Sequence, residues 1–98
     1  IRDACRNLGT YDLSGCDLYT SAQPCPMCLS AIIWANIKTV YYGNTAKDTA
    51  AIGFRDDYIY QFIENGCKNT NVLSLTQLDR DEANKIFAAY KEKNMTIY

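Results

Sequence analysis

The sequence has no histidine, no excess of basic residues and no long apolar run. Without histidine, no imidazole can serve as a base or a metal ligand within these 98 residues. Ten basic residues against eleven acidic ones give no excess of positive charge with which to bind a long nucleic acid. No run of about 18 apolar residues is present to cross a bilayer, and the opening IRDACRNLG is too polar for a signal peptide. We therefore expect a cytoplasmic protein with no membrane partner, for which a nucleic-acid partner is disfavoured.

Cysteine, by contrast, is well represented. The five cysteines are odd in number and irregular in spacing, which favours reduced thiols or metal ligands over a disulfide framework. Cys25 and Cys28 stand in the stretch "TSAQPCPMCLS", with one proline before the first cysteine and another between the two. A Cys-x-x-Cys pair can be a redox couple, half of a structural zinc site, or two ligands of a catalytic metal.

Hydrophobic spacing divides the chain into alternating elements. It predicts helices over residues 1–8, 26–36, 58–64 and 79–93, strands over 17–21, 38–43 and 71–76, and a loop of small residues before the third helix. The 26–36 helix is apolar enough to be buried. The order α-β-α-β-α-β-α favours an α/β protein with helices on both faces of a sheet and parallel neighbouring strands. No linker is evident, so we expect one domain over residues 1–98.

This order places the cysteine pair where a strand gives way to a helix. Cys25 falls at the mouth of the helix and Cys28 in its first turn, so that the two sulfurs face the same way. Pro26 suits the first helical position. The partial positive charge at a helix N-terminus favours thiolates, the form that binds metal or attacks a disulfide.

Two interpretations of the pair have weak support. A thioredoxin-like redox fold needs a cis-proline on a later strand, but the only prolines are Pro24 and Pro26. A structural tetrathiolate zinc site would draw on two of Cys5, Cys16 and Cys67, none of which forms a second Cys-x-x-Cys. Those three cysteines are assigned to structure.

The third interpretation comes from a family resemblance. The segment "YTSAQPCPMCLSAIIWANIKTVYYG" resembles the zinc-dependent cytidine and deoxycytidylate deaminase superfamily, and "AAIGFRDDYIYQFI" is similar to the bacterial guanine deaminases. The resemblance implies a three-layer α/β/α sandwich with a central mixed sheet. It also implies a Zn²⁺ ion, held by Cys25, Cys28 and a histidine, that presents hydroxide to a ring carbon.

The sequence differs from the pattern of this family at two places. The His-x-Glu that supplies the third zinc ligand and the proton-shuttling glutamate is not in the sequence, so we expect an N-terminally incomplete deaminase domain that cannot catalyse the reaction alone. Gln23 stands where many relatives have glutamate. Because glutamine keeps the shape and loses only a charge, we expect little effect on zinc.

The substrate is inferred from the same resemblance. In the guanine deaminases an aspartate of the Gly-Phe-x-Asp segment contacts the base and moves protons to the leaving amine, which points to Asp56 rather than Asp57. The alternative is that one aspartate caps the following helix. Trp34 is a further candidate for the pocket lining, or else core. We therefore expect hydrolytic conversion of guanine to xanthine and ammonia, with a tRNA adenosine deaminase or a cytosine deaminase as alternatives.

The C-terminal tail "KEKNMTIY" closes on apolar residues. In the guanine deaminases that the chain resembles, the C-terminal helix crosses to a neighbouring subunit, and the last residue helps close the partner's active site. The resemblance thus implies a homodimer in which Tyr98 reaches the other subunit's site, with residues 64–71 or the turn before Asp79 as the hinge. The alternative is that the tail packs on its own domain.

Overall fold

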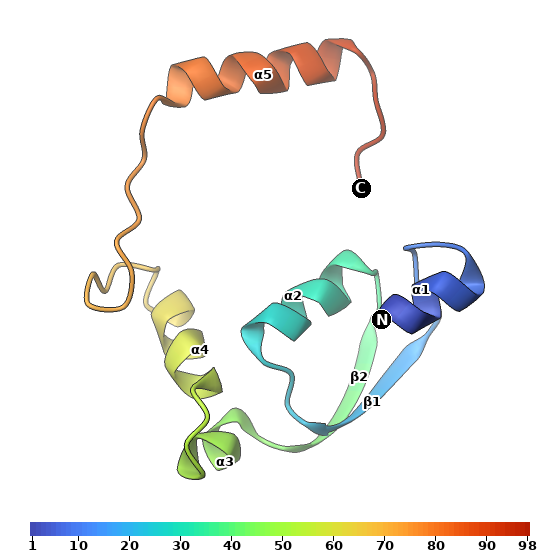
Figure 1. Ribbon diagram of the computed structural model, residues 1–98, viewed down its shortest axis with the longest axis vertical. Helices are drawn as coiled ribbons and strands as arrows, with labels where there is room; N and C mark the ends of the chain where they lie inside the picture. The colour runs from blue at the N-terminus through green and yellow to red at the C-terminus, as the bar shows by residue number, and fades with distance from the viewer. The chain divides into compact units, whose positions relative to one another are not determined.

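The computed structural model describes all 98 residues and divides into two compact units, residues 1–66 and residues 67–98 (Figure 1). The first unit contains six of the elements: α1 (Arg2–Leu8), β1 (Asp17–Ala22), α2 (Pro26–Trp34), β2 (Thr39–Asn44), α3 (Ala46–Ala51) and α4 (Asp56–Glu64). The second contains α5 (Arg80–Glu92). No helix is long and apolar enough to cross a membrane.

The two strands form a parallel pair connected through α2. Their register runs from Asp17 opposite Thr39 to Ala22 opposite Asn44. Both strands are rich in tyrosine, threonine and other residues that favour extended backbone. Because parallel strands need a crossover, the β1–α2–β2 order sets the turn from β1 into α2 at one end of the pair, directly before Cys25.

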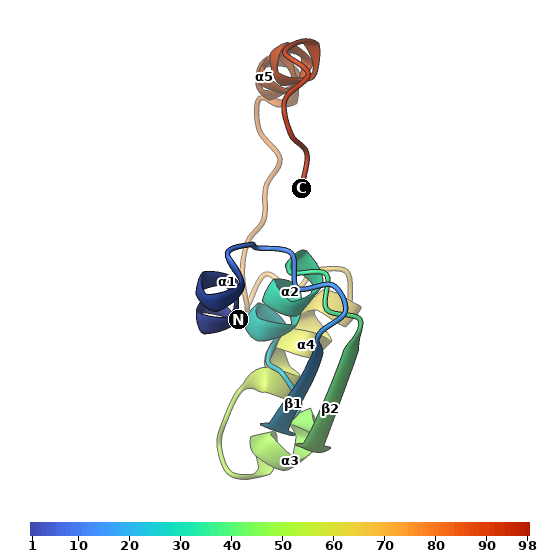
Figure 2. The same cartoon turned by 90° about the vertical axis from the view of Figure 1, so that its right-hand side faces the viewer.

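The core of the first unit lies on one face of this strand pair. Figure 2 shows the two strands side by side. Leu18 of β1 and Val40 of β2 are paired in register and pack against a buried cluster together with residues of α1 and α2. The buried members are Leu13, Ile32, Ala35 and Ile37. On the opposite face, the rings of Tyr19 and Tyr41 stack with centroids 4.9 Å apart and remain exposed.

The predicted buried helix over 26–36 is shorter and less buried than expected. α2 ends at Trp34, and only Pro26 and Ile32 within it are buried. Its apolar residues lie around the whole helix, whereas a helix on a strand pair buries one side only. Met27 and Ile33 therefore stay exposed.

Helix α3 occupies the segment that the sequence predicted to be a loop. Its start is a capping box: the Thr45 hydroxyl accepts a hydrogen bond from the Asp48 amide at 3.2 Å, and the Asp48 carboxylate accepts one from the Thr45 amide at 2.9 Å. Together these bonds satisfy two amides that a helix start would leave unpaired. The Thr-x-x-Asp spacing was the signal that the sequence prediction missed.

The second unit corrects another expectation. Residues 71–76 form no strand; a turn at Asn69 is followed by irregular backbone up to α5. The apolar character of "NVLSLT" predicted a strand, but a strand needs a hydrogen-bonding partner, and none lies beside this segment. The predicted last helix is confirmed as α5, and the Tyr90 hydroxyl donates a 2.5 Å hydrogen bond to the carbonyl oxygen of Thr96 in the tail.

Candidate metal site at the start of helix α2

The two cysteines stand at the start of α2, as the sequence predicted. Cys25 is the N-cap residue with an extended backbone (φ −65°, ψ 164°), Pro26 opens the helix, and Cys28 lies in the first turn. The Cys25 carbonyl accepts the first helical hydrogen bond from the amide of Leu29 at 2.8 Å. No side chain caps this helix end, so the first amides of α2 have no capping side-chain partner.

The two thiols influence each other directly. The pKa of Cys28 is raised, chiefly by a hydrogen bond with Cys25, then by charge repulsion from Cys25, by desolvation and by the charge of Asp56. The raised pKa of Cys28 opposes the thiolate form that a helix N-terminus favours; the hydrogen bond with Cys25 is the larger cause, and repulsion from the charge of Cys25 is the second. A divalent cation between them would remove that repulsion, which is the behaviour expected of a pair of metal ligands.

A cavity of about 800 Å³ opens beside the cysteines. Its walls come from the end of β1, the start of α2 and the first residues of the chain. Both cysteines line it, together with Gln23, Pro24 and Thr20. The volume falls in the range of small-molecule sites, about 300–1,000 Å³.

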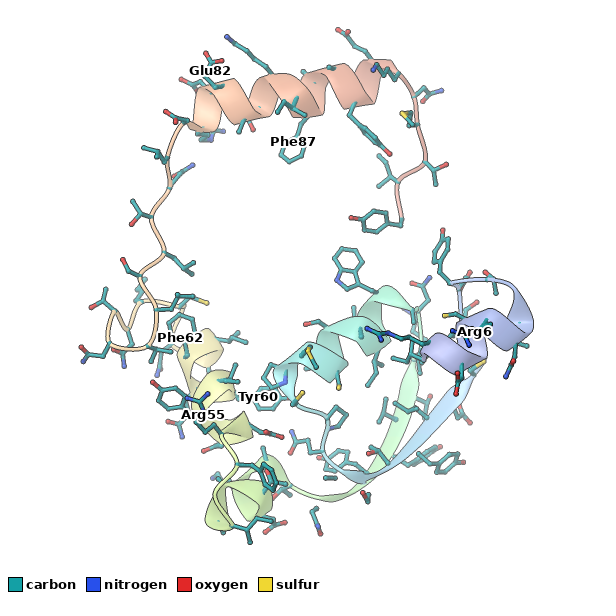
Figure 3. The ribbon with its side chains drawn as sticks, viewed as in Figure 1. Arg6, Arg55, Tyr60, Phe62, Glu82 and Phe87 are labelled. Atoms are coloured by element: carbon teal, nitrogen blue, oxygen red, sulfur yellow. The ribbon has the colours of Figure 1, made fainter.

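The segment that leads into Cys25 is fixed by hydrogen bonds from distant parts of the chain. The Gln23 amide donates to the Asn44 carbonyl at 2.6 Å, and the Gln23 side-chain oxygen accepts from the Ala46 amide at 2.8 Å. The Tyr60 hydroxyl donates to the Pro24 carbonyl oxygen, and Figure 3 shows Tyr60 between α4 and the start of α2. The sequence prediction missed Gln23 and Tyr60 as supports of the site, because neither bond is local.

Asp56 is the first residue of α4 and is half-buried. Its charge raises the pKa values of both Cys28 and Tyr60, which places the carboxylate in the neighbourhood of the thiol pair. Asp57 instead accepts a 2.8 Å hydrogen bond from the Gln61 side chain. The N-cap position belongs to Arg55, and no side chain caps α4, so neither aspartate has the capping role considered above.

Trp34 and Tyr98 complete the set of predicted site residues. Trp34 is the last residue of α2, and because its side chain is 62% exposed it is not part of the core. It is not among the residues that line the cavity. Tyr98 is the last residue of the second unit. Cys5 and Cys16 pack against the core of the first unit, and Cys67 is half-buried at the start of the second.

The donor set fits half of a zinc site. Nowhere in the chain do three or more histidine, cysteine, aspartate or glutamate side chains gather closely enough to hold a metal. Cys25 and Cys28 would provide two thiolate ligands of the four-coordinate arrangement that zinc prefers. Their i, i+3 spacing at the start of α2 and their shared place in the wall of the cavity are consistent with that role.

Comparison with known proteins supports this assignment of the region. Residues 1–44 match the family model of the cytidine and deoxycytidylate deaminase zinc-binding region. The chain is 43% identical to a guanine deaminase of Bacillus subtilis over 97 residues, which cover 94% of the chain and 62% of that protein. It is 51% identical to a tRNA-specific adenosine deaminase of Agrobacterium fabrum over 43 residues, 44% of the chain and 28% of that protein.

A solved structure agrees with the sequence comparison. The X-ray structure of the guanine deaminase from Bacillus subtilis superposes with a TM-score of 0.78 at 40% identity, covering 100% of the chain and 60% of that structure. The resemblance to the zinc-dependent deaminases and the α/β, cytidine deaminase-like fold predicted from the sequence are both confirmed. The chain spans about three fifths of the length of the guanine deaminase it matches.

Proposed function

We propose that the protein takes part in zinc-dependent hydrolytic deamination of a free purine base, with guanine converted to xanthine and ammonia. The observation that carries the proposal is the thiol pair of Cys25 and Cys28, which lines a cavity inside the segment matching the deaminase zinc-binding region. Similarity to a guanine deaminase along 94% of the chain favours guanine over other bases. The site of action that we propose is the cytoplasm.

The chain's own residues have separate tasks in this proposal. Cys25 and Cys28 would hold the metal, and their i, i+3 spacing from the N-cap into the first turn of α2 would bring the two sulfurs to one side of the helix. Zinc bound in such a site lowers the pKa of water and makes it a nucleophile near neutral pH. Asp56 carries a proton to the departing amine, a task suited to a half-buried carboxylate beside the thiol pair.

A tRNA adenosine deaminase is the second candidate within the same fold. It is favoured by 51% identity to such an enzyme over 43 residues around the cysteine motif. The charge balance favours a small base, because ten basic residues against eleven acidic ones provide no excess of positive charge for a polyanion. The shorter span of that match also favours guanine, since the similarity to guanine deaminase continues beyond the metal region.

We further propose a homodimer in which the C-terminal segment is exchanged between subunits, so that Tyr98 contacts the partner's site. The proposal rests on the resemblance to guanine deaminases. Two features of the chain support it: the boundary between the compact units falls after Gly66, inside the hinge segment 64–71, and α5 has no buried residue. Ile86 and Phe87 of α5 are each more than 70% exposed and would gain from burial against a partner.

The test compares metal content and ammonia release in matched cysteine variants of the full-length protein. Cys25→Ala and Cys28→Ala should each abolish stoichiometric zinc binding and the release of ammonia from guanine. Cys5→Ala and Cys16→Ala, which change thiols packed against the core, should retain zinc. Zinc retained after loss of Cys25 or Cys28 would refute the site, and deamination of tRNA in preference to guanine would favour the second candidate.

A further inference from the structure

Tyr60 connects helix α4 to the segment that enters the cysteine motif. Its hydroxyl donates a hydrogen bond to the carbonyl oxygen of Pro24, the residue directly before Cys25 (Figure 3). Tyr60 also follows Asp56 by four residues, so the two side chains lie on the same side of α4, one turn apart. One side chain thus links the helix that carries the acidic residue to the loop that carries the first thiol.

The geometry of this loop makes the bond consequential. Pro24 has no amide hydrogen, so its peptide carbonyl is the only backbone group through which it can be held. The Tyr60 hydroxyl is its single hydrogen-bond partner in the structure. That carbonyl belongs to the peptide plane leading into Cys25, which lies outside the regular helix as the N-cap, whereas Cys28 is fixed within the first turn. Rotation of this plane would move the Cys25 sulfur relative to that of Cys28.

Tyr60 is suited to be a permanent donor. Desolvation by burial is the largest cause that raises its pKa, followed by the negative charge of Cys25 and of Asp56. The phenol therefore stays protonated at neutral pH and keeps its hydrogen on the Pro24 carbonyl. Tyr58, on the same helix, is 47% exposed and makes no hydrogen bond through its hydroxyl, which makes it a matched control.

We infer that Tyr60 is a positioning residue that holds the Cys25 thiol at the separation from Cys28 needed to bind a metal ion. The inference rests on the proposed function in that it takes the two thiols as metal ligands. Gln23, the residue before Pro24, is held by its bonds to Asn44 and Ala46. Tyr60 holds the following peptide, which joins Pro24 to Cys25. Together they leave Cys25 little freedom before metal binds, and a preorganised site binds more tightly.

The experiment measures zinc affinity in the full-length protein by competition with a chromophoric chelator. Tyr60→Phe removes one hydroxyl and keeps the ring, so the fold is expected to persist. Zinc should bind about three- to tenfold more weakly, the factor that corresponds to one neutral hydrogen bond. Tyr58→Phe should bind zinc as the unchanged protein does. Cobalt(II) added alone should give an altered ligand-field spectrum in Tyr60→Phe, because the angle between the thiolate ligands changes.

Each outcome separates positioning from a merely structural role. A lower melting temperature of Tyr60→Phe together with unchanged zinc affinity and an unchanged cobalt spectrum would overturn the inference. Weaker zinc binding in a protein that does not deaminate guanine would uphold the positioning role while refuting the proposed function. If the protein deaminates guanine, but Tyr60→Phe binds zinc as tightly as the unchanged protein, the proposed function is upheld and the positioning role is overturned.

Discussion

Replacing Gly43 by alanine tests the closest backbone approach in the strand pair. The register places Ser21 opposite Gly43, between the Thr20–Tyr42 and Ala22–Asn44 pairs. A Cβ atom added at Gly43 would lie 2.7 Å from the backbone carbonyl oxygen of Ser21, closer than real Cβ contacts come. Because the obstacle is backbone held in a hydrogen-bonded ladder, no side-chain rotation relieves the clash, and the strands must separate.

The magnitude follows from two opposing effects. Forcing an extra carbon against the fixed backbone of a neighbouring strand is comparable to overpacking, which costs about 1–3 kcal/mol. Alanine also restricts the unfolded chain more than glycine does, which stabilises the protein by about 0.4–1 kcal/mol. The midpoints of these two ranges lead us to expect that Gly43→Ala lowers the free energy of unfolding by about 1.3 kcal/mol, and the melting temperature by about 4–8 °C for each kcal/mol.

The assay is urea unfolding followed by circular dichroism, with thermal melting as a second measurement. Asn44→Ala is the matched control, since it changes an exposed side chain in the same strand and keeps the carbonyl that pairs with Gln23. The control should stay within about 0.5 kcal/mol of the unchanged protein. Equal or greater stability of Gly43→Ala would refute the reasoning, because it would mean that the strands can part without cost.

Three further predictions concern the site, helix α3 and the tail. Asp56→Asn should lower the rate of ammonia release from guanine at least about a hundredfold, whereas Asp57→Asn should have a much smaller effect; equal losses would argue against proton transfer by Asp56. Thr45→Ala should lower stability by about 1 kcal/mol in urea unfolding. The hydrogen bond from the Thr45 backbone amide is the largest cause that lowers the pKa of Asp48, so the stabilisation by the Asp48 carboxylate is present above the ordinary value of 3.8 and is lost as the pH falls through the lowered one; a stability difference between the unchanged protein and Asp48→Asn that persists at lower pH would contradict it. Finally, a zinc-ligand variant refolded together with a variant lacking Tyr98 should regain activity if the tails are exchanged, and a monomer on sizing or no recovery would exclude exchange.

Local signals explain which parts of the site could be predicted. Prolines around the cysteines, with β-forming residues before them, define a strand-to-helix corner from neighbouring residues alone. The structure accordingly has β1 ending at Ala22 and α2 beginning at Pro26, close to the predicted bounds. The first turn of the helix then fixes Cys28, whereas the peptide that leads into the N-cap residue Cys25 is held by Tyr60 from another helix.

Features that depend on a partner were predicted less well. The segment 71–76 has the composition of a strand, but composition does not provide a neighbouring strand, and the structure leaves it irregular. The burial of α2 was overestimated for a similar reason, because an apolar helix is buried only on the side that another element covers. Helix α3 was missed although its capping residues were visible, since small residues alone suggested a loop.

The contrast between local and non-local signals also explains the role of Gln23. From the sequence, its position before Pro24 and Cys25 suggested only a lost charge near the metal. In the structure its side-chain oxygen accepts a hydrogen bond from the Ala46 amide in the first turn of α3. Its backbone amide donates a hydrogen bond to the Asn44 carbonyl at the end of β2. An acceptor oxygen, which glutamine and glutamate share, is what this bond requires, so charge at this position is secondary to shape. The cysteine motif supplies the ligands, and residues some 20 to 36 positions away hold the backbone that presents them.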